Sequence, residues 1–126
     1  MPYTYESPVT EKLAEFADRG PRDEEMRLDA ATSFDWDIVF YFLDGTPKKD
    51  INETVGLTLF ANESGRYYEH GPLLVFRRGD EIVHAVAIMP PLFISGTYRG
   101  SYRPDEAILI AHTKDPGPYS LRFSDY

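Results

Sequence analysis

Residues 32–56, TSFDWDIVFYFLDGTPKKDINETVG, contain the pattern that decides the fold. In the first half of this stretch every second side chain is apolar, and from Val39 onward the intervening side chains are apolar as well. Such a pattern predicts a β-strand that enters at the rim of a sheet and becomes covered on both faces. The side chains expected on the first face are Phe34, Trp36, Ile38, Phe40 and Phe42.

Two helices are predicted beside this strand from the signals at their ends. Residues 48–55 follow a Thr-Pro pair, which supplies a cap and a first-turn proline, and precede Gly56, which can end a helix in the left-handed conformation. Residues 8–19 follow Ser7 and begin with proline, and Gly20 can end this helix in the same way. The apolar stripe of the longer helix consists of Val9, Leu13, Phe16 and Ala17.

The remaining chain predicts mostly strands. Two β-branched or aromatic runs within residues 72–89 meet at Arg78-Gly79-Asp80, which is typical of a hairpin. The glycine-rich residues 92–107 predict a loop with at most one short strand. Further short strands are predicted at 26–31, 57–60, 108–113 and 119–123.

Sequential strands joined by short turns, with helices near the front, indicate the α+β class. We expect one domain over residues 1–126, with a mostly antiparallel sheet packed by the N-terminal helix and by one short second helix. The side chains expected in its core are Trp36, Phe40, Phe42, Val75, Val86 and Ile110.

Composition limits the classes of function. The chain has no cysteine, which excludes disulfides, thiolate catalysis and cysteine-based metal sites within it. No apolar run approaches the roughly 18 residues of a membrane-spanning helix, and no signal peptide is visible at the start. Phosphate-binding and dinucleotide-binding glycine motifs are absent as well, so no cofactor is predicted.

The negative charge is concentrated in one half of the chain. Residues 1–65 carry 6 Lys/Arg and 14 Asp/Glu, a net charge of −8, whereas residues 66–126 carry 7 of each. Nucleic-acid binding is not expected, because it needs clustered basic side chains. A basic protein partner fits the acidic half better, and a solvated acidic surface is the simpler alternative.

Paired carboxylates and three histidines are the side chains with catalytic or metal-binding potential. Asp35 and Asp37 could bind a divalent cation together, but no third ligand or nucleophile is near, which favours capping of a neighbouring turn. His70, His84 and His112 lack the spacing of a helical zinc site, and His84 is predicted to be hydrogen-bonded in the core or at its rim. The sequence leaves open whether these five side chains converge in space. No catalytic residue and no metal site is predicted.

The best candidate for a binding site is the segment GTYRGSYRP, residues 96–104. Tyrosine and arginine often anchor protein interfaces, and long loops in compact domains tend to be functional. The alternative is that the rings fold over the core while the arginine stems lie along it. The residues predicted to contact a protein partner are Tyr98, Arg99, Tyr102 and Arg103, together with Tyr67 and Tyr68 from the preceding loop.

The first half of the chain also resembles a group of small, largely uncharacterised bacterial lipoproteins. The resemblance rests on a Thr-x-Phe-Asp-Trp-Asp block and its surroundings, and the hairpin at 73–86 is similar as well. It implies an envelope protein tethered by a lipidated N-terminal cysteine, with no known enzyme activity. Since this chain has no cysteine, either the sequence begins after that residue or this member is cytoplasmic. The residues that carry the resemblance are Leu28, Thr32, Phe34, Asp35, Trp36, Asp37, Tyr41, Thr46, Ile51, Asn52 and Gly56.

Three functions follow as expectations from the sequence. The first is a non-enzymatic, envelope-associated binding or accessory domain. The second is an acidic immunity or inhibitor protein that binds a basic toxin or enzyme. The third is a small hydrolase whose site is assembled only in three dimensions.

Overall fold

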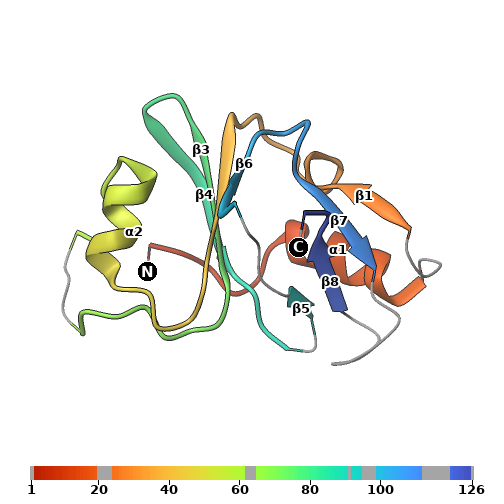
Figure 1. Cartoon of the computed structure of the whole chain (residues 1–126), viewed down its shortest axis with the longest axis horizontal. Coiled ribbons are helices and arrows are strands. Elements are labelled where there is room, and N and C mark those ends of the chain that lie inside the picture. Colours follow the sequence, from red (N-terminus) through yellow and green to blue (C-terminus); the bar gives the residue numbers. More distant parts are fainter. Residues whose placement is uncertain are drawn as a thin grey trace.

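The structure, a computed structural model, describes residues 2–19, 24–61, 65–90, 92–94, 99–111 and 120–125, with backbone alone for Arg19 and Phe93. The class is α+β with mostly antiparallel strands, as predicted (Figure 1). In chain order the elements are α1 (Pro8–Arg19), β1 (Glu25–Arg27), the 3-10 helix η1 (Leu28–Ala31), β2 (Ile38–Phe42), α2 (Lys48–Val55), β3 (Leu73–Arg78), β4 (Glu81–Ala87), β5 (Phe93–Ile94), β6 (Ser101–Tyr102), β7 (Ile108–Ala111) and β8 (Ser120–Phe123).

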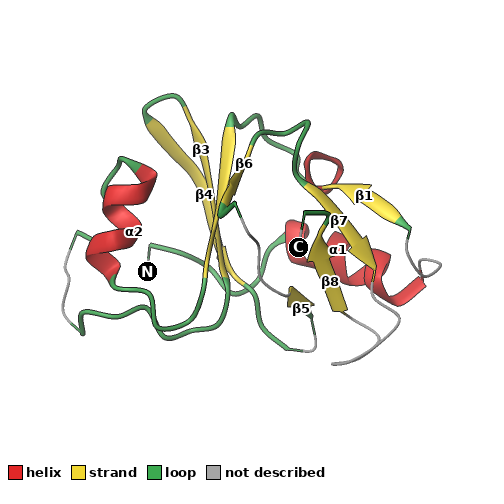
Figure 2. Cartoon of the chain, viewed as in Figure 1, coloured by secondary structure: helices red, strands yellow, loops and turns green. Residues whose placement is uncertain are grey.

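The strands form two four-stranded sheets. Sheet A has the order β4-β3-β2-β6 and is antiparallel throughout. Sheet B has the order β1-β7-β8-β5, and its β5–β8 pair is parallel. Figure 2 shows α2 and the N-terminal segment on one side of sheet A, with sheet B and α1 on the other side. Sheet A is therefore the middle layer.

The central strands of sheet A are buried on both faces, which confirms the prediction from the apolar run. Val39 and Tyr41 of β2 pack in a cluster with α1 and sheet B, whereas Phe40 and Phe42 pack in a second cluster with α2. The apolar stripe of α1 is buried in the first of these clusters. The predicted core side chains Trp36, Phe40, Phe42, Val75, Val86 and Ile110 are all buried.

The start of the opening strand differs from the prediction. β2 begins at Ile38, and Phe34 and Trp36 pack in the cluster of Val39 rather than with Phe40. Trp36 Nε1 donates a hydrogen bond to Thr32 Oγ1 at 3.1 Å. The chain bends before Ile38, so the alternation of a strand does not extend back to the tryptophan.

The short elements differ more from expectation than the long ones. Residues 57–60 form no strand, and residues 28–31 continue β1 as a 3-10 helix. The loop expected over 92–107 contains two strands of two residues each, β5 and β6. Gly56 ends α2 with φ +79°, as predicted, whereas the predicted helix end at Gly20 lies outside the described residues.

The helix α2 is joined to sheet A at its C-terminal end. Ile51 and Val55 of α2 are fully buried against β2 and β3. Arg77 of β3 donates a hydrogen bond from Nη1 to the Val55 carbonyl, and its guanidinium lies 5.4 Å from the centre of the Phe40 ring. These contacts fix the end of α2 on the sheet.

The N-terminal segment runs along the outer edge of sheet A. Thr4 N donates to the Ala85 carbonyl at 3.0 Å, and Ala87 N donates to the Thr4 carbonyl at 2.8 Å. β4 is an edge strand, so Thr4 satisfies backbone groups that no other strand of sheet A reaches. Within the described residues, none of the helices combines the length and the apolar character needed to span a bilayer.

Candidate functional site

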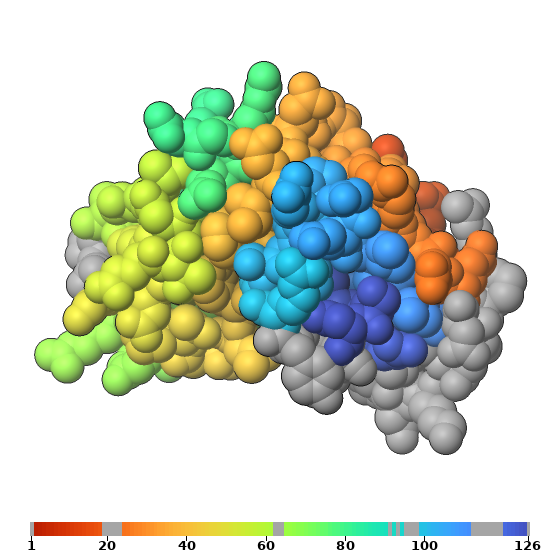
Figure 3. Space-filling view, turned by 45° about the horizontal axis from the view of Figure 1, so that its top comes forward, coloured from red at the N-terminus to blue at the C-terminus, as the bar shows by residue number. Residues whose placement is uncertain are grey.

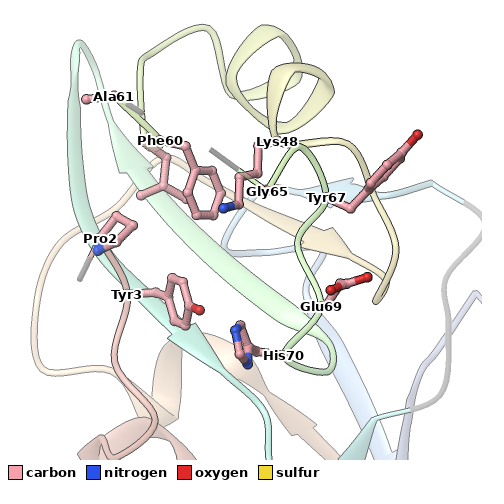
Figure 4. A pocket seen from close by; sticks show the side chains of 10 residues that line it. Pro2, Tyr3, Lys48, Phe60, Ala61, Gly65, Tyr67, Glu69 and His70 are labelled. Atoms are coloured by element: carbon pink, nitrogen blue, oxygen red, sulfur yellow. The ribbon is translucent and has the colours of Figure 1, made fainter. Parts of the chain in front are cut away.

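A hollow opens on the side of sheet A that carries α2 (Figure 4). Its volume is about 510 Å³, within the range of small-molecule sites. We call it the aromatic hollow. The lining residues are Pro2, Tyr3, Lys48, Leu59, Phe60, Ala61, Gly65, Tyr67, Glu69 and His70.

One wall of the aromatic hollow is held in place by Asn52. The Asn52 Oδ1 atom accepts hydrogen bonds from Leu59 N and Phe60 N, both at 2.9 Å, and its Nδ2 atom donates to the Phe60 carbonyl at 3.0 Å. A side chain of α2 thus takes the place of a strand partner for this segment. This explains why residues 57–60 are ordered without joining a sheet.

The opposite part of the wall begins at the first residue of α2. Lys48 N donates to the Arg66 carbonyl at 2.8 Å, and Arg66 has φ +57°, the only positive value at a non-glycine position in the described parts of the chain. Lys48 Nζ lies 5.3 Å from the centre of the Phe60 ring, in the geometry of a cation–π contact. The backbone therefore anchors the residue that brings an ammonium group to the aromatic wall.

Tyr3 and His70 line the aromatic hollow, and the rings of Tyr5 and Tyr68 pack against them. The Tyr3 ring lies 5.4 Å from Tyr68, 5.8 Å from Tyr5 and 6.0 Å from His70, centre to centre. Tyr68 donates its hydroxyl proton to the His70 carbonyl at 3.1 Å. Burial and the neighbouring Tyr5 raise the pKa of Tyr3 to about 12, and burial raises the pKa of Tyr68 as well. The phenols of Tyr3 and Tyr68 therefore stay protonated well above physiological pH.

The predicted contact residues of the 67–68 pair are divided between surface and core. Tyr67 is 50% exposed and borders the aromatic hollow, but Figure 4 shows its phenol pointing away from Phe60. Tyr68 is 1% exposed and packs in the cluster of Phe40 and Phe42. The prediction of Tyr68 as a contact residue is therefore wrong, because its ring is part of the core.

The predicted Tyr/Arg loop is divided in the same way. Arg99 and Arg103 are exposed, and Tyr98 lies outside the described residues. Tyr102 is 2% exposed, stacks on Phe123 at 4.5 Å and donates to Asp125 Oδ1 at 2.6 Å. Burial and that hydrogen bond raise the pKa of Tyr102. The prediction that Tyr102 contacts a partner is therefore wrong as well, because its ring is buried in the core.

Arg99 interacts with the protein's own side chains. Its guanidinium forms an ion pair with Glu106 at 3.0 Å and lies 5.2 Å from the centre of the Tyr102 ring. Arg103 N and the Arg99 guanidinium both donate to Glu106, and these bonds lower the pKa of its carboxyl group. Such exposed ion pairs contribute little to stability. Figure 3 shows residues coloured yellow, near 45–50, between this blue segment and the light green one near 65–70, so the described residues of the two segments are separated on this face.

The aspartates of the Asp-Trp-Asp block do not act together. Asp37 Oδ2 accepts a hydrogen bond from Gly79 N at 2.6 Å and so caps the β3–β4 turn, as the simpler hypothesis predicted. Asp35 is exposed and borders a separate, mostly polar hollow beside Trp36. Among the described residues, no three carboxylate or imidazole groups lie close enough to hold a metal ion. His112 lies outside those residues.

A serine and a histidine that are 77 positions apart in the sequence do meet. Ser7 Oγ lies 2.8 Å from His84 Nε2, and Val9 N donates to Ser7 Oγ at 3.1 Å at the start of α1. His84 also packs against the rings of Phe34 and Phe76. The pair connects the start of α1 to sheet A. It confirms the prediction that His84 is hydrogen-bonded at the rim of the core.

The environment of His84 makes stability depend on pH. Burial lowers the pKa of His84 from 6.5, so the unfolded chain binds this proton more readily than the folded chain does. This histidine should leave the free energy of unfolding unchanged above about pH 6.5 and lower it as the pH falls below that value. Denaturant titrations across this range should show a weaker pH dependence in His84→Gln. An equal pH dependence in His84→Gln and in the unchanged protein would contradict the assignment.

Comparisons with protein-family models, with curated proteins and with solved structures found no match to this chain. The resemblance to bacterial lipoproteins therefore stays a prediction. Sequence reasoning missed Lys48, Phe60 and Asn52 as parts of a site. An asparagine in the middle of a helix is a signal that could have pointed to Asn52, because its side chain competes for backbone groups.

Proposed function

We propose that this protein is a non-enzymatic binding domain and that the aromatic hollow is its ligand site. The observation that carries the proposal is the combination of a cavity of about 510 Å³, a largely aromatic and apolar lining, and few polar side chains on it. Apolar concave sites with a few placed polar groups are typical of small-molecule recognition. An envelope location, for which the lipoprotein resemblance is the only support, belongs to the same proposal.

Two features favour binding over hydrolysis. The Ser7 hydroxyl is 5% exposed and already accepts a hydrogen bond at the start of α1, so it is poorly placed to attack a substrate. His84 contacts aromatic rings and Ser7, and neither residue lines the aromatic hollow. A hydrolase would need a nucleophile and a base that open into a cavity.

A second candidate function is the capture of a basic protein. Glu11, Glu15 and Asp18 are exposed along α1, on the side opposite its buried stripe, and Glu24 and Glu25 follow nearby in the chain. Such a row of carboxylates would speed association with a basic surface. It supports this function less strongly than the cavity supports ligand binding, because a solvated acidic helix needs no partner.

The proposal is tested by filling the aromatic hollow. Ala61 is exposed and lines the cavity, so Ala61→Trp should occupy it without disturbing the core. We expect small aromatic and aliphatic fragments to shift the amide NMR signals of Leu59, Phe60 and Ala61 in the unchanged protein, and to lose most of this effect in Ala61→Trp. Thr58→Trp, at an exposed position outside the lining, is the matched control and should bind normally. Fragment binding that is equal in both variants, or absent in the unchanged protein, would refute the proposal.

A further inference from the structure

We infer that residues 2–7 form an acid-sensitive strap, and that protonation of His84 releases this N-terminal strap from the edge of sheet A. The release requires no ligand, so it is independent of the function proposed for the aromatic hollow. Three features of the molecule support it: the path of the strap, the direction of the Ser7–His84 hydrogen bond, and the surroundings of the imidazole.

The N-terminal strap crosses the edge of sheet A from one face to the other. Tyr3 packs in the buried cluster on the α2 side, whereas Val9, just after the strap, packs in the cluster on the α1 side. Figure 1 shows the strap, coloured red, running between these two sides. At the crossing, Thr4 N donates to the Ala85 carbonyl at 3.0 Å and Ala87 N donates to the Thr4 carbonyl at 2.8 Å. These two bonds are the backbone anchor of the strap.

The other end of the strap is anchored by the hydrogen bond between Ser7 Oγ and His84 Nε2, at 2.8 Å. Ser7 Oγ also accepts a hydrogen bond from Val9 N, which caps the start of α1. The hydroxyl group still has one proton to donate, and within the described residues His84 Nε2 is the acceptor in its reach. His84 therefore accepts this bond in its neutral form and carries its own proton on Nδ1.

Protonation of His84 removes the acceptor of this bond, because an imidazolium only donates. Ser7 is 5% exposed, so water reaches its hydroxyl group only if the strap moves. The new positive charge also lies at the N-terminal end of α1, where the helix dipole disfavours a cation. Both effects favour a state in which Ser7 has left His84.

The imidazole of His84 is surrounded by aromatic rings rather than by carboxylates. Its ring centre lies 5.3 Å from that of Phe34 and 6.2 Å from that of Phe76. Across the described ranges, no charged side chain of the elements around it forms a hydrogen bond or an ion pair with His84. Arg77 lies over Phe40 on the other face of sheet A, and the remaining ones are exposed. The charged side chains on these elements are Glu6, Glu11, Lys12, Asp35, Asp37, Arg77, Arg78 and Glu81.

The pH range of the release follows from the pKa of His84 in the two states of the strap. Burial lowers this pKa while the strap is bound. Once the strap is released, the imidazole gains solvent, and its pKa returns toward the ordinary value of about 6.5. The released state therefore binds the proton more readily, and its population rises as the pH falls below about 6.5. Above that pH the strap stays bound.

The release is confined to the strap and the first turn of α1. Further along the helix, Leu13 and Ala17 hold α1 in the buried cluster that it shares with sheet B. Release uncovers the Ala85 carbonyl and the Ala87 amide on the outer edge of β4, and it withdraws Tyr3 from the wall of the aromatic hollow. Acid thus opens an edge of sheet A while the sheet itself stays folded.

The test is native-state hydrogen exchange of the full chain, followed by NMR at pH 7 and at pH 5. The amide of Ala87 is the main reporter, because it donates to the strap rather than to another strand. After correction for the intrinsic pH dependence of exchange, the protection of the Ala87 and Thr4 amides should be lower at pH 5 by about 3-fold or more.

Two variants separate His84 from other titrating groups. His84→Gln, whose amide oxygen can still accept from Ser7, should reduce the change in Ala87 protection to less than about 2-fold. Glu6→Gln is the matched control, because it removes an exposed titratable group from the strap itself, and it should keep the full change. Equal Ala87 protection at both pH values, or the same loss in His84→Gln as in the unchanged protein, would overturn the inference.

A further measurement separates release of the strap from unfolding of the whole domain. Low concentrations of denaturant should barely alter the exchange of the Ala87 amide, since a local opening exposes little surface, whereas the amides of β3 should exchange much faster. A response of Ala87 as strong as that of β3 would contradict a local release. If His84→Gln does not fold, Ser7→Ala takes its place: it removes the bond to His84 and should lower Ala87 protection already at pH 7. Normal protection in Ser7→Ala would equally overturn the inference.

Discussion

Replacing Phe76 with alanine is expected to lower the free energy of unfolding by about 3–5 kcal/mol, the usual cost of removing a buried aromatic ring. Phe76 is fully buried in the middle of β3, between sheet A and α1. Its ring contacts Trp36 at 5.1 Å and Phe34 at 5.3 Å, both edge to face. Alanine would leave a cavity where three elements meet, and the rigid strand cannot close it.

The measurement for Phe76→Ala is a denaturant titration followed by the fluorescence of Trp36, the single tryptophan of the chain. Tyr67→Ala is the matched control, because it removes an aromatic ring that is half exposed, and it should change stability by less than about 0.5 kcal/mol. A loss below about 1 kcal/mol in Phe76→Ala would mean that the ring does not fill the core as described. Since small domains have only about 5–15 kcal/mol of stability, the variant is expected to be partly unfolded at elevated temperature.

Replacing Asn52 with alanine is expected to lower the free energy of unfolding by about 2–3 kcal/mol and to abolish the fragment binding proposed for the aromatic hollow. The substitution removes all three hydrogen bonds to the segment of Leu59 and Phe60, and leaves partly buried backbone groups without partners. The gain from the higher helix propensity of alanine is at most about 0.7 kcal/mol, so it cannot offset this loss. Phe60 should then leave its place beside Lys48.

Two measurements separate a local effect of Asn52→Ala from general unfolding. The amide NMR signals of Leu59, Phe60 and Ala61 should move, while those of β7 should stay in place. Glu53→Ala, an exposed change at the next residue of α2, should leave both stability and these signals nearly unaltered. A stable Asn52→Ala protein with unchanged Phe60 signals would show that the segment is held by other contacts.

The sequence predicted the elements that carry strong signals of their own. Proline and glycine at the ends of α2, and the periodic stripe of α1, are local features, and both helices were found where they were expected. Two-residue strands such as β5 and β6 are too short to show alternation. The sequence placed Trp36 on the same face as Phe40, because the two residues keep the spacing of a strand. In the structure the chain bends before Ile38, and Trp36 contacts Thr32 and Phe76 instead.

The candidate site was harder to predict than the fold. In the Tyr67-Tyr68 pair one ring is exposed and the other is buried, and two adjacent identical residues give no local sign of which is which. The lysine and phenylalanine that meet at the aromatic hollow are twelve positions apart, on α2 and on a segment without regular structure. Their approach depends on Asn52, so it is a result of tertiary contacts.

The pairing of Thr4 with β4 also bears on how copies of this protein behave toward each other. An unpaired edge strand offers a row of amide and carbonyl groups to any other chain, which is a common route to polymerisation. Thr4 occupies the Ala85 carbonyl and the Ala87 amide on that edge, and buried Tyr3 and Ser7 hold the segment on either side of it. The first few residues therefore cover this edge of sheet A, and we expect proteolytic trimming of the segment to expose it to edge-to-edge pairing between copies.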